Sequence, residues 1–474
     1  MTIASLVWTV VKIALMVLFT LSVAAILTWY DRRGGAMIQD RVGPNRASIK
    51  ILGFELRLGG LLHTAADGLK FFTKEDFMPP KADKLLFSLA PILTMVPVLV
   101  LLAVIPFGDT ISTDLLWKHV CFKDGGGHAM LPVNGACSAG YAMATVFPAA
   151  QRFGLSASSE SIALMVSPLN VGLLFVFAMA GQGIVAASIA GWSSDNKFSL
   201  MGAVRAASQM VSYEVTLGLT LVGAMMLYGS LRLDEMVRWQ GENAWGIFVQ
   251  PVAFILFFTA AIAETKRIPF DLPEAESELV SGYFTEYSGM KFGMFYFAEY
   301  MEVITSSMLL VTIFLGGWQL PFLHRDGISV AFGDAVVFAT RLPHIWVTII
   351  GVVTFFGKTL FICWIQAFVR WSLPRFRYDQ LMKLGWTVLL PASLANIMAT
   401  AIIWLALQSG GEGAASFLKV AGDVTQAFTG IAVVAGFAWA VVGFLRTPPV
   451  REQIIGSSAE LAVAARRAKT TATA

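Results

Sequence analysis

Residues 264–300 read ETKRIPFDLPEAESELVSGYFTEYSGMKFGMFYFAEY, a charged stretch between two long apolar runs, 245–263 and 294–320. Ionisable groups so close to a bilayer are costly, and they usually serve proton or ion traffic rather than packing. A solvated acidic loop is the alternative interpretation, although Pro269 and Pro273 restrict the turn. The carboxylates are Glu264, Asp271, Glu274, Glu276, Glu278, Glu286 and Glu299, with Glu302 just beyond the stretch.

The composition of the whole chain predicts an all-α, polytopic membrane protein. Of its 474 residues, 56% are hydrophobic and only 14% are charged. We expect each apolar run that can span about 30 Å of hydrocarbon to be a helix. The first run lacks a small-residue cleavage site, so we interpret it as a retained helix rather than a signal peptide. The candidate spans are 5–29, 83–106, 161–190, 204–229, 245–263, 294–320, 345–369, 386–408 and 425–445.

The distribution of basic residues predicts the orientation of these spans. If the helices alternate across the membrane, the loops on one side, with two helix-edge residues, hold 24 Lys and Arg, and the opposite loops hold 8. The basic side is expected to be cytoplasmic, with the N-terminus periplasmic and the C-terminus cytoplasmic in a bacterial inner membrane. The basic excess fits topology and anionic lipid, and nothing suggests nucleic acid. The basic side comprises 30–82, 191–203, 264–293, 370–385 and the tail from 446.

The loops on the basic side are too short to fold alone, so we expect them to pack on one another or on a partner. One of them contains an apolar face at helical spacing, which predicts an amphipathic helix over 57–74 lying in the membrane interface. A plain linker is the alternative. The apolar face consists of Leu58, Leu61, Leu62, Ala65, Leu69 and Phe72.

Several segments resemble one protein family. They are RVGPNR at 41–46, AADGLKFFTKE at 65–75, GWSSDNKFSLMGAVRAASQMVSYE at 191–214, the 264–300 stretch and LPRFRYDQLMKLGW at 373–386. Together they resemble the H subunit of bacterial NADH:quinone oxidoreductase, respiratory complex I, which is the equivalent of the mitochondrial ND-one protein.

The resemblance covers roughly 5–408 and implies two regions, a transmembrane domain like that of the family, 1–408, and a C-terminal extension, 409–474. The extension would carry a ninth helix and a basic tail. Two further departures from the family are the long external loop 107–160 and Asp31, where the family more often has Glu.

The resemblance implies that the cytoplasmic end helps to form a chamber in which quinone, ubiquinone or menaquinone, is reduced as substrate. The isoprenoid tail needs an apolar route, which the first span, the amphipathic helix and the aromatic residues 295–297 would line. For Arg370, anchoring at the headgroup level is the alternative. The family positions at the chamber are matched by Arg32, Arg41, Asp67 and Arg370.

The acidic stretch is then expected to couple quinone reduction to proton translocation. Carboxylates held close in a poorly hydrated site cannot all ionise and must share protons. In the family such a path leads to antiporter-like subunits, with Glu214 and Glu299 as deeper stations. For Glu214, a structural hydrogen bond to a neighbouring helix is the alternative. The first stations of the path would be Glu264, Asp271, Glu274, Glu276 and Glu278.

Other ionisable and cysteine residues have simpler expectations. Lys358 lies near the centre of the seventh span, so we expect a carboxylate partner, Glu214 or Glu299. Cys121 and Cys137 share the external loop, where a disulfide is expected in an oxidising compartment.

No CxxC spacing or histidine cluster predicts a metal, iron–sulfur cluster or flavin site in this chain. These groups should belong to the partners that the resemblance implies, which are peripheral quinone-site subunits and antiporter-like membrane subunits. No catalysis is expected from the isolated chain.

Two alternatives remain from the sequence. A similar subunit occurs in complex I-like membrane-bound hydrogenases, which would change the electron donor. A secondary transporter also places acids at depth, but we find no paired half-repeats, and charge gathers at the cytoplasmic ends instead of the midplane.

Overall fold

The structure is a computed structural model of the chain. It describes residues 3–44, 46–51, 54–56, 58–112, 120–123, 129–130, 141–144, 161–273, 279–324, 327–332, 335–342, 344–409, 422, 424–425, 427–432 and 435–436. The chain divides into two compact units, Met1–Gln426 and Ala427–Ala474, and most of the second lies outside these residues.

The first unit is an all-α bundle of apolar helices. Among the described residues, seven helical segments are long and apolar enough to cross a membrane, and one further apolar helix is shorter. These eight segments correspond to the first eight predicted spans, so the prediction of an all-α polytopic membrane protein is confirmed. They are α1 (Ile3–Ile38), α3 (Lys84–Leu101), α6 (Gly172–Ala180) with α7 (Gln182–Ser193), α8 (Lys197–Tyr228), the shorter α11 (Pro251–Glu264), α13 (Gly289–Phe314), α14 (His344–Ser372), and α15 (Tyr378–Lys383) continuing through a π-helical turn (Leu384–Leu389) into α16 (Leu390–Ser409).

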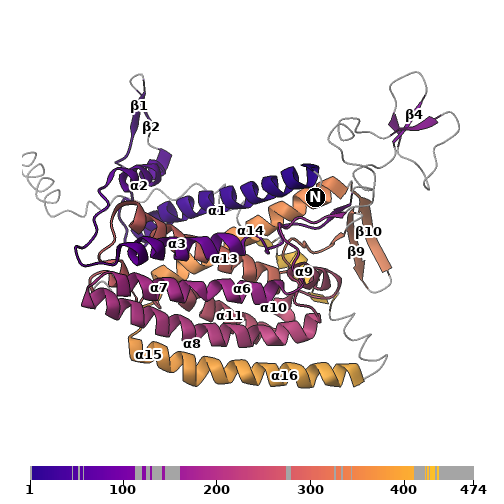
Figure 1. Cartoon of the computed structure of the whole chain (residues 1–474). Helices are drawn as coiled ribbons and strands as arrows, with labels where there is room; N and C mark the ends of the chain where they lie inside the picture. Colours follow the sequence, from indigo (N-terminus) through magenta and orange to yellow (C-terminus); the bar gives the residue numbers. More distant parts are fainter. Residues whose placement is uncertain are drawn as a thin grey trace, which may run out of the picture. The chain divides into compact units, whose positions relative to one another are not determined.

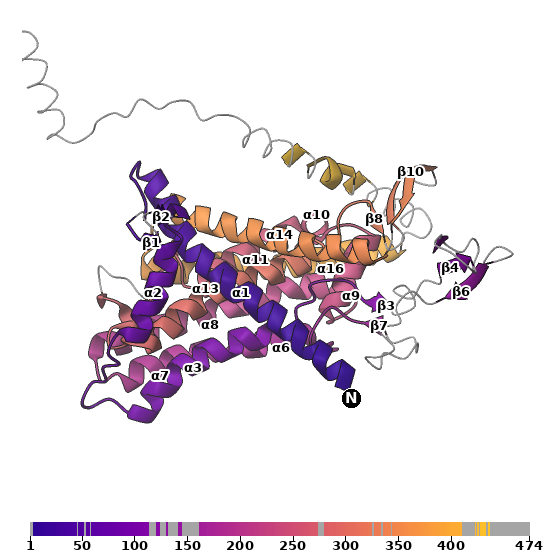
Figure 2. The same cartoon turned by 90° about the horizontal axis from the view of Figure 1, so that it is seen from above.

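Two helices organise this bundle. Helix α8 packs against α7, α11 and α16, while α13 packs against α3, α14 and α1. The helices run side by side in Figure 1, and the view from above in Figure 2 shows α1 crossing α13. Large apolar side chains on the outer helices, such as Val353 (65% exposed) and Leu405 (68%), face outward, as lipid-facing residues do.

Helix ends follow local sequence signals. Asn196 accepts a hydrogen bond from the Phe198 backbone N–H and so caps α8, which ends at Gly229 in the left-handed region (φ 65°). Pro251 is the first residue of α11, where its missing N–H costs nothing. The third predicted span, 161–190, begins too early, because the helix starts only at Gly172.

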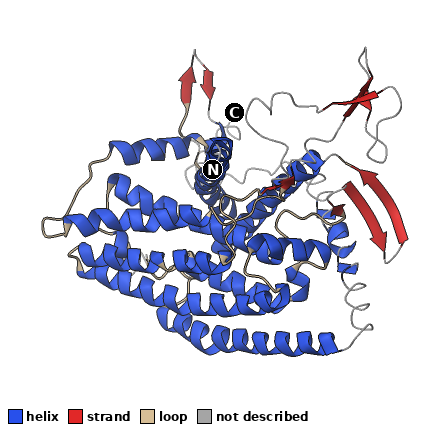
Figure 3. Cartoon of the chain, turned by 45° about the vertical axis from the view of Figure 1, so that its right-hand side comes forward, coloured by secondary structure: helices blue, strands red, loops and turns tan. Residues whose placement is uncertain are grey.

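Short elements join the helices at the two ends of the bundle. The end with α2 (Leu62–Thr73) and α15 lies opposite the end with α9 (Leu233–Glu242) and the β9–β10 pair (Figure 1). Figure 3 shows most of the described strands, in red, beyond the ends of the helices, in blue. All strand pairings are antiparallel: β1 (Ile49–Ile51) with β2 (Phe54–Leu56), β3 (Ile111–Ser112) with β7 (Ser161–Ile162), β4 (Val120–Lys123) between β5 (Ala129–Met130) and β6 (Tyr141–Ala144), and β9 (Gly327–Phe332) between β8 (Leu323–His324) and β10 (Ala335–Arg341). Two short helices, α9 (Leu233–Glu242) and α10 (Gly246–Val249), precede α11.

The predicted amphipathic helix is present but shorter than expected. Helix α2 spans Leu62–Thr73, after a single 3₁₀ turn at Leu58–Gly60. Gly59 and Gly60 have φ of 60° and 98°, so the chain cannot continue one α-helix through them. The predicted start at residue 57 is therefore wrong, while the apolar side chains of Leu69 (67% exposed) and Phe72 (74% exposed) are largely uncovered.

Two apolar clusters hold the bundle together. The larger one lies among α8, α11, α13 and α14, and a smaller aromatic one joins α3 and α7 to the segment before α13. In the smaller cluster α8 approaches the 279–284 segment very closely. A Cβ at Gly202 would lie 2.7 Å from the Gly282 Cα, so no larger residue fits there without a backbone shift.

Three expectations fall largely outside the described residues and stay predictions. These are the ninth span at 425–445, the fold of loop 107–160, and the Cys121–Cys137 disulfide.

Candidate functional site

The loops predicted to share one side of the membrane contact one another. Asn196, in the loop before α8, donates a hydrogen bond to Glu286 Oε1 (2.6 Å) in the segment before α13. Arg375, after α14, pairs with Asp271 Oδ2 at 2.8 Å in the segment after α11. The expectation that these loops pack on one another is confirmed.

Asp31 is the centre of the first candidate site. It lies near the end of α1 with a side chain only 7% exposed, and its Oδ2 accepts hydrogen bonds from Arg370 Nη1 (2.6 Å), Arg267 Nη1 (3.1 Å) and the Tyr300 hydroxyl (2.8 Å). The Arg267 guanidinium also stacks on the Tyr300 ring, 3.8 Å from its centroid. We call these four residues the Asp31 cluster.

The cluster holds Arg267 firmly in its charged form. Burial disfavours the cation, but the nearby Tyr300 and Asp31 raise the pKa of Arg267 above its ordinary value. Two guanidinium groups share one carboxylate here, and Asp31 Oδ1 makes no hydrogen bond with a described residue. The cluster is thus a buried, cation-rich site with an available acceptor oxygen.

A second ion pair lies beside this cluster. Arg32, the next residue on α1, pairs with Asp67 of α2 at 2.6 Å, and Lys70 approaches the same carboxylate at 3.8 Å. Two predicted chamber residues are therefore in direct contact. Arg41 does not join them, because its Nε donates to Gln39 Oε1 (2.7 Å) on an exposed part of the chain.

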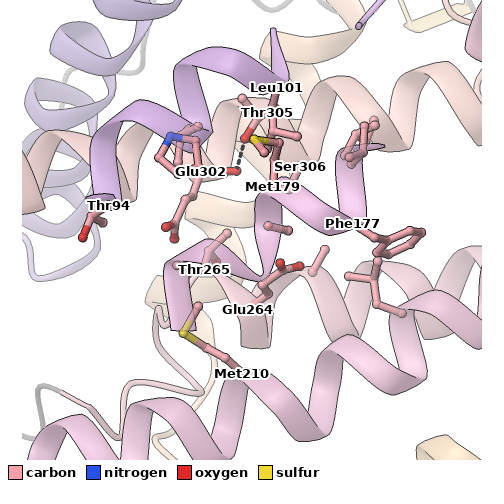
Figure 4. A pocket seen from close by; sticks show the side chains of 18 of the residues that line it. Thr94, Leu101, Phe177, Met179, Met210, Glu264, Thr265, Glu302, Thr305 and Ser306 are labelled. Carbon is pink, nitrogen blue, oxygen red and sulfur yellow. Dashed lines mark hydrogen bonds between the residues drawn. The ribbon is translucent and has the colours of Figure 1, made fainter. Parts of the chain in front are cut away.

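Two acids, Glu264 and Glu302, line a small cavity of about 60 Å³ between α3, α6, α7, α8, α11 and α13. Glu264, the last residue of α11, and Glu302 of α13 both line it, together with Thr94, Thr305 and Ser306. Figure 4 shows the two carboxylates among these side chains. We call this space the acid cavity.

Two further predicted acids, Glu214 and Glu299, lie on α8 and α13. Glu214 of α8 is within electrostatic range of Glu264, as are Glu302 and Lys266. Glu299 precedes Glu302 by about one turn of α13 and is 7% exposed. Glu299 is therefore buried in the bundle, Glu214 is half-buried, and their role as deeper stations stays a prediction.

Short stretches of chain connect the Asp31 cluster to the acid cavity. Arg267 of the cluster directly follows Lys266, whose Nζ lies 3.6 Å from Glu302 Oε2. On α13, Tyr300 of the cluster lies two residues before Glu302. A change of charge at the cluster therefore occurs close to the acids of the cavity.

The rest of the acidic stretch is only partly described. Asp271 is buried and paired with Arg375, which ties the predicted first station to the loop after α14. Glu274, Glu276 and Glu278 lie outside the described residues.

Two expectations are wrong. Lys358 does not pair with a carboxylate among the described residues: its Nζ donates to the carbonyl oxygens of Leu315 (2.6 Å), Gly317 (3.1 Å) and Gln319 (2.6 Å), and it lies 4.0 Å from the Trp245 ring centroid. The carbonyls after α13 supply the negative potential that a carboxylate was expected to supply.

Phe295 is also not available to line a quinone route. It is 1% exposed and packs in the smaller aromatic cluster, in contact with Tyr287, at a centroid distance of 4.8 Å. Tyr296 is only partly buried, and its hydroxyl lies 3.2 Å from that of Tyr300 in the Asp31 cluster.

Sequence reasoning missed the centre of the site. Asp31 was singled out only as a departure from the family, and Arg267 and Tyr300 were quoted in motifs without a role. For Asp31 and Arg267 the available signal is their position, because each closely follows an apolar run, where a charged group needs a partner. No group of three or more His, Cys, Asp or Glu suited to a metal ion occurs in the described part of the chain.

A bundle of apolar helices long enough to cross a membrane, with a buried ion-pair cluster at one end, defines a polytopic membrane protein. The family described as NADH dehydrogenase matches residues 11–401. An H subunit of the NADH-quinone oxidoreductase of Cytophaga hutchinsonii, numbered 1, is 37% identical over 384 residues, covering 81% of this chain and 93% of that protein. The H subunit numbered 2 of Geobacter sulfurreducens is 40% identical over 389 residues, with 82% and 94% covered.

The chain therefore belongs to the family of H subunits of NADH-quinone oxidoreductases. This assignment supports the complex I interpretation of the sequence over the hydrogenase and transporter alternatives.

Proposed function

We propose that this chain is the membrane-arm subunit of a proton-pumping NADH:quinone oxidoreductase that helps to form the quinone-reduction chamber and couples reduction to proton translocation. The observation that carries the proposal is the short connection between a cation-rich cluster at one end of the bundle and an acid cavity inside it, through Lys266–Arg267 and α13.

The chamber is assigned to the end that holds the Asp31 cluster and the Arg32–Asp67 pair. A quinone carbonyl gains negative charge as it takes up electrons, and preorganised cations in a poorly hydrated site stabilise such charge. Arg267 and Arg370 meet this requirement because Asp31 holds both guanidinium groups in place. Arg32 and Asp67 tie the middle of α2 to α1, which positions the wall of the chamber.

Coupling to protons is assigned to the acid cavity. At an effective dielectric constant of about 20, a unit charge about 10 Å away changes the energy of an ionised group by about 1.7 kcal/mol, roughly one pH unit of proton affinity. A charge that forms on the quinone at about this distance from Glu264 is sufficient to alter the proton occupancy of Glu264. A change at Glu264 then alters the proton occupancy of Glu214 and Glu299. Asp271, Glu274, Glu276 and Glu278 are proposed as the entry to this path.

The proposal includes quinone, ubiquinone or menaquinone, as the substrate, and other subunits of the complex as partners. Flavin and iron–sulfur clusters are assigned to peripheral subunits, and proton channels to antiporter-like membrane subunits. In the proposed orientation the Asp31 cluster faces the cytoplasm of a bacterial cell and the N-terminus faces the periplasm. The division into a transmembrane domain, 1–408, and an extension, 409–474, is part of the proposal.

The chamber is tested with Arg32→Ala and Asp67→Asn in the intact complex. Both variants should lower NADH:quinone reduction much more than NADH oxidation by an artificial acceptor, because the donor module is untouched while the headgroup loses positioning. Asp76→Asn, which removes a half-exposed partner of Lys291 at the same end, is the matched control. A role in the chamber would be contradicted if both activities fell equally, or if neither activity fell.

A further inference from the structure

The proton path expected from the sequence does not include the ion pair between Lys266 and Glu302. The Lys266 side chain is 1% exposed and that of Glu302 is 16% exposed, with 3.6 Å between Nζ and Oε2. Lys266 also has a positive φ of 55°, a conformation that residues with side chains rarely adopt. Such a backbone conformation persists only where the surrounding structure stabilises it, and it is commonly found at functional sites.

The positions of these groups limit how many protons the acid cavity can hold. Glu302 and Glu264 line the same space (Figure 4), and Lys266 lies within electrostatic range of Glu264. With all three ionised, the set carries a net charge of −1 in a poorly hydrated site. One bound proton makes it neutral, which is the state that burial favours.

We propose that Glu302 and Glu264 share one exchangeable proton, and that Lys266 neutralises whichever carboxylate is ionised. This inference rests on the proposed function and adds Lys266 and Glu302 to its proton-handling residues. The cavity volume of about 60 Å³ is enough for one or two water molecules to relay the proton between the carboxylates. Glu302 Oε2 makes no hydrogen bond with a described residue, so it can accept one from such a relay.

The other charged groups around this set are few in the described part of the chain. Glu214 faces Glu264 from α8, and Glu299 precedes Glu302 on α13. Helices α3 and α7 contribute uncharged lining, such as Thr94 and Gly183. Among the described cations, Lys266 is within electrostatic range of both Glu264 and Glu302, while Arg267 is in range of Glu299.

The test is the pH dependence of NADH-driven proton pumping by the complete complex in proteoliposomes. We call the pH range over which pumping is lost as the pH rises the alkaline limb. In Glu302→Gln, Lys266 interacts with Glu264 alone, and Glu264 then stays ionised down to a lower pH. The alkaline limb should therefore move to lower pH by about one pH unit. In Lys266→Gln the cation is lost, so the alkaline limb should move up by about one pH unit. A pair that only stabilises the fold would not shift the limb in opposite directions.

Two further variants keep the charge of the side chain that they replace, Lys266→Arg as a control and Glu302→Asp as a milder test. Lys266→Arg should leave the limb near its wild-type position. Glu302→Asp keeps the carboxylate but shortens its reach, so it should move the limb in the same direction as Glu302→Gln by a smaller amount. Lys291→Gln removes a different lysine ion pair, that with Asp76, and should not move it.

The inference would be overturned if the alkaline limb did not move in Glu302→Asp, Glu302→Gln and Lys266→Gln. It would also be overturned if Glu302→Gln and Lys266→Gln moved the limb in the same direction. If the glutamine variants fail to assemble, the Glu302→Asp shift decides the matter. Glu264→Gln separates this inference from the proposed function. Loss of pumping in Glu264→Gln with unmoved limbs elsewhere refutes only the inference, whereas wild-type pumping in Glu264→Gln refutes the proposed function as well.

Discussion

Substitution of Asp31 should destabilise the junction of α1, α13 and α14 more than any exposed ion pair does. Its carboxylate is 7% exposed and accepts from Arg267, Arg370 and Tyr300. Removing one partner of a buried pair typically costs about 3–5 kcal/mol, because the remaining charge stays buried. Arg370 is 33% exposed and is partly screened by solvent, so most of the cost comes from Arg267, which is 13% exposed.

The measurement is the thermal inactivation midpoint of NADH:quinone reduction in membranes, with the amount of assembled complex determined in parallel. Asp31→Ala should lower both strongly, and Asp31→Asn less, since the amide oxygen still accepts from Tyr300. Asp31→Glu keeps the charge and should remain close to wild type. The double variant Asp31→Ala/Arg370→Ala should recover part of the loss, because one uncompensated cation is removed.

Asp76→Asn provides the reference for an exposed pair. Its partner Lys291 lies at 2.9 Å, but Asp76 is 50% exposed, so the expected cost is about 0–1 kcal/mol. If Asp31→Ala were no more damaging than Asp76→Asn, the Asp31 cluster would not be the structural centre of this end of the bundle.

Three further predictions follow from the same contacts and from the sequence. Arg41→Ala should impair quinone reduction less than Arg32→Ala does, because Arg41 forms its hydrogen bond with Gln39 on an exposed part of the chain. The measurement is the rate of quinone reduction relative to that of artificial-acceptor reduction, and a larger loss in Arg41→Ala would refute the prediction. Glu274→Gln and Glu278→Gln should leave assembly intact and lower coupled turnover, with the double variant costing less free energy than the summed single losses; additive losses would show that they act independently. Cys121 and Cys137 should be joined, closing a loop of about 15 residues that contributes roughly 3 kcal/mol; non-reducing peptide mapping that finds both thiols free would exclude the bond.

The helices could be predicted from the sequence because a helix that crosses the hydrocarbon layer needs an apolar run of a fixed minimum length, and such a run is visible in the sequence. Boundaries were less accurate where polar residues continue a helix. The first span was expected to end at residue 29, but α1 continues to Ile38 and carries Asp31 and Arg32 with it. These residues form no loop, because their charges are satisfied by partners on other helices.

The site was only partly predictable because its contacts join distant parts of the chain. Asp31 meets Arg267 and Arg370 across 236 and 339 residues of sequence, and one sequence holds no information on that pairing. The acids could be predicted because isolated carboxylates in apolar surroundings are conspicuous. The partner of Lys358 could not, because backbone carbonyls after α13 leave no sequence signal of their own.

The most direct test of the account is the number of protons translocated per NADH oxidised by the purified Glu264→Gln complex in proteoliposomes. Glutamine preserves the size of the side chain and removes the exchangeable proton, so the complex should assemble and oxidise NADH with an artificial acceptor at the wild-type rate. Quinone-coupled proton translocation should fall severely. A Glu264→Gln complex that pumps protons at the wild-type rate and stoichiometry would contradict the assignment of the acid cavity to the proton path.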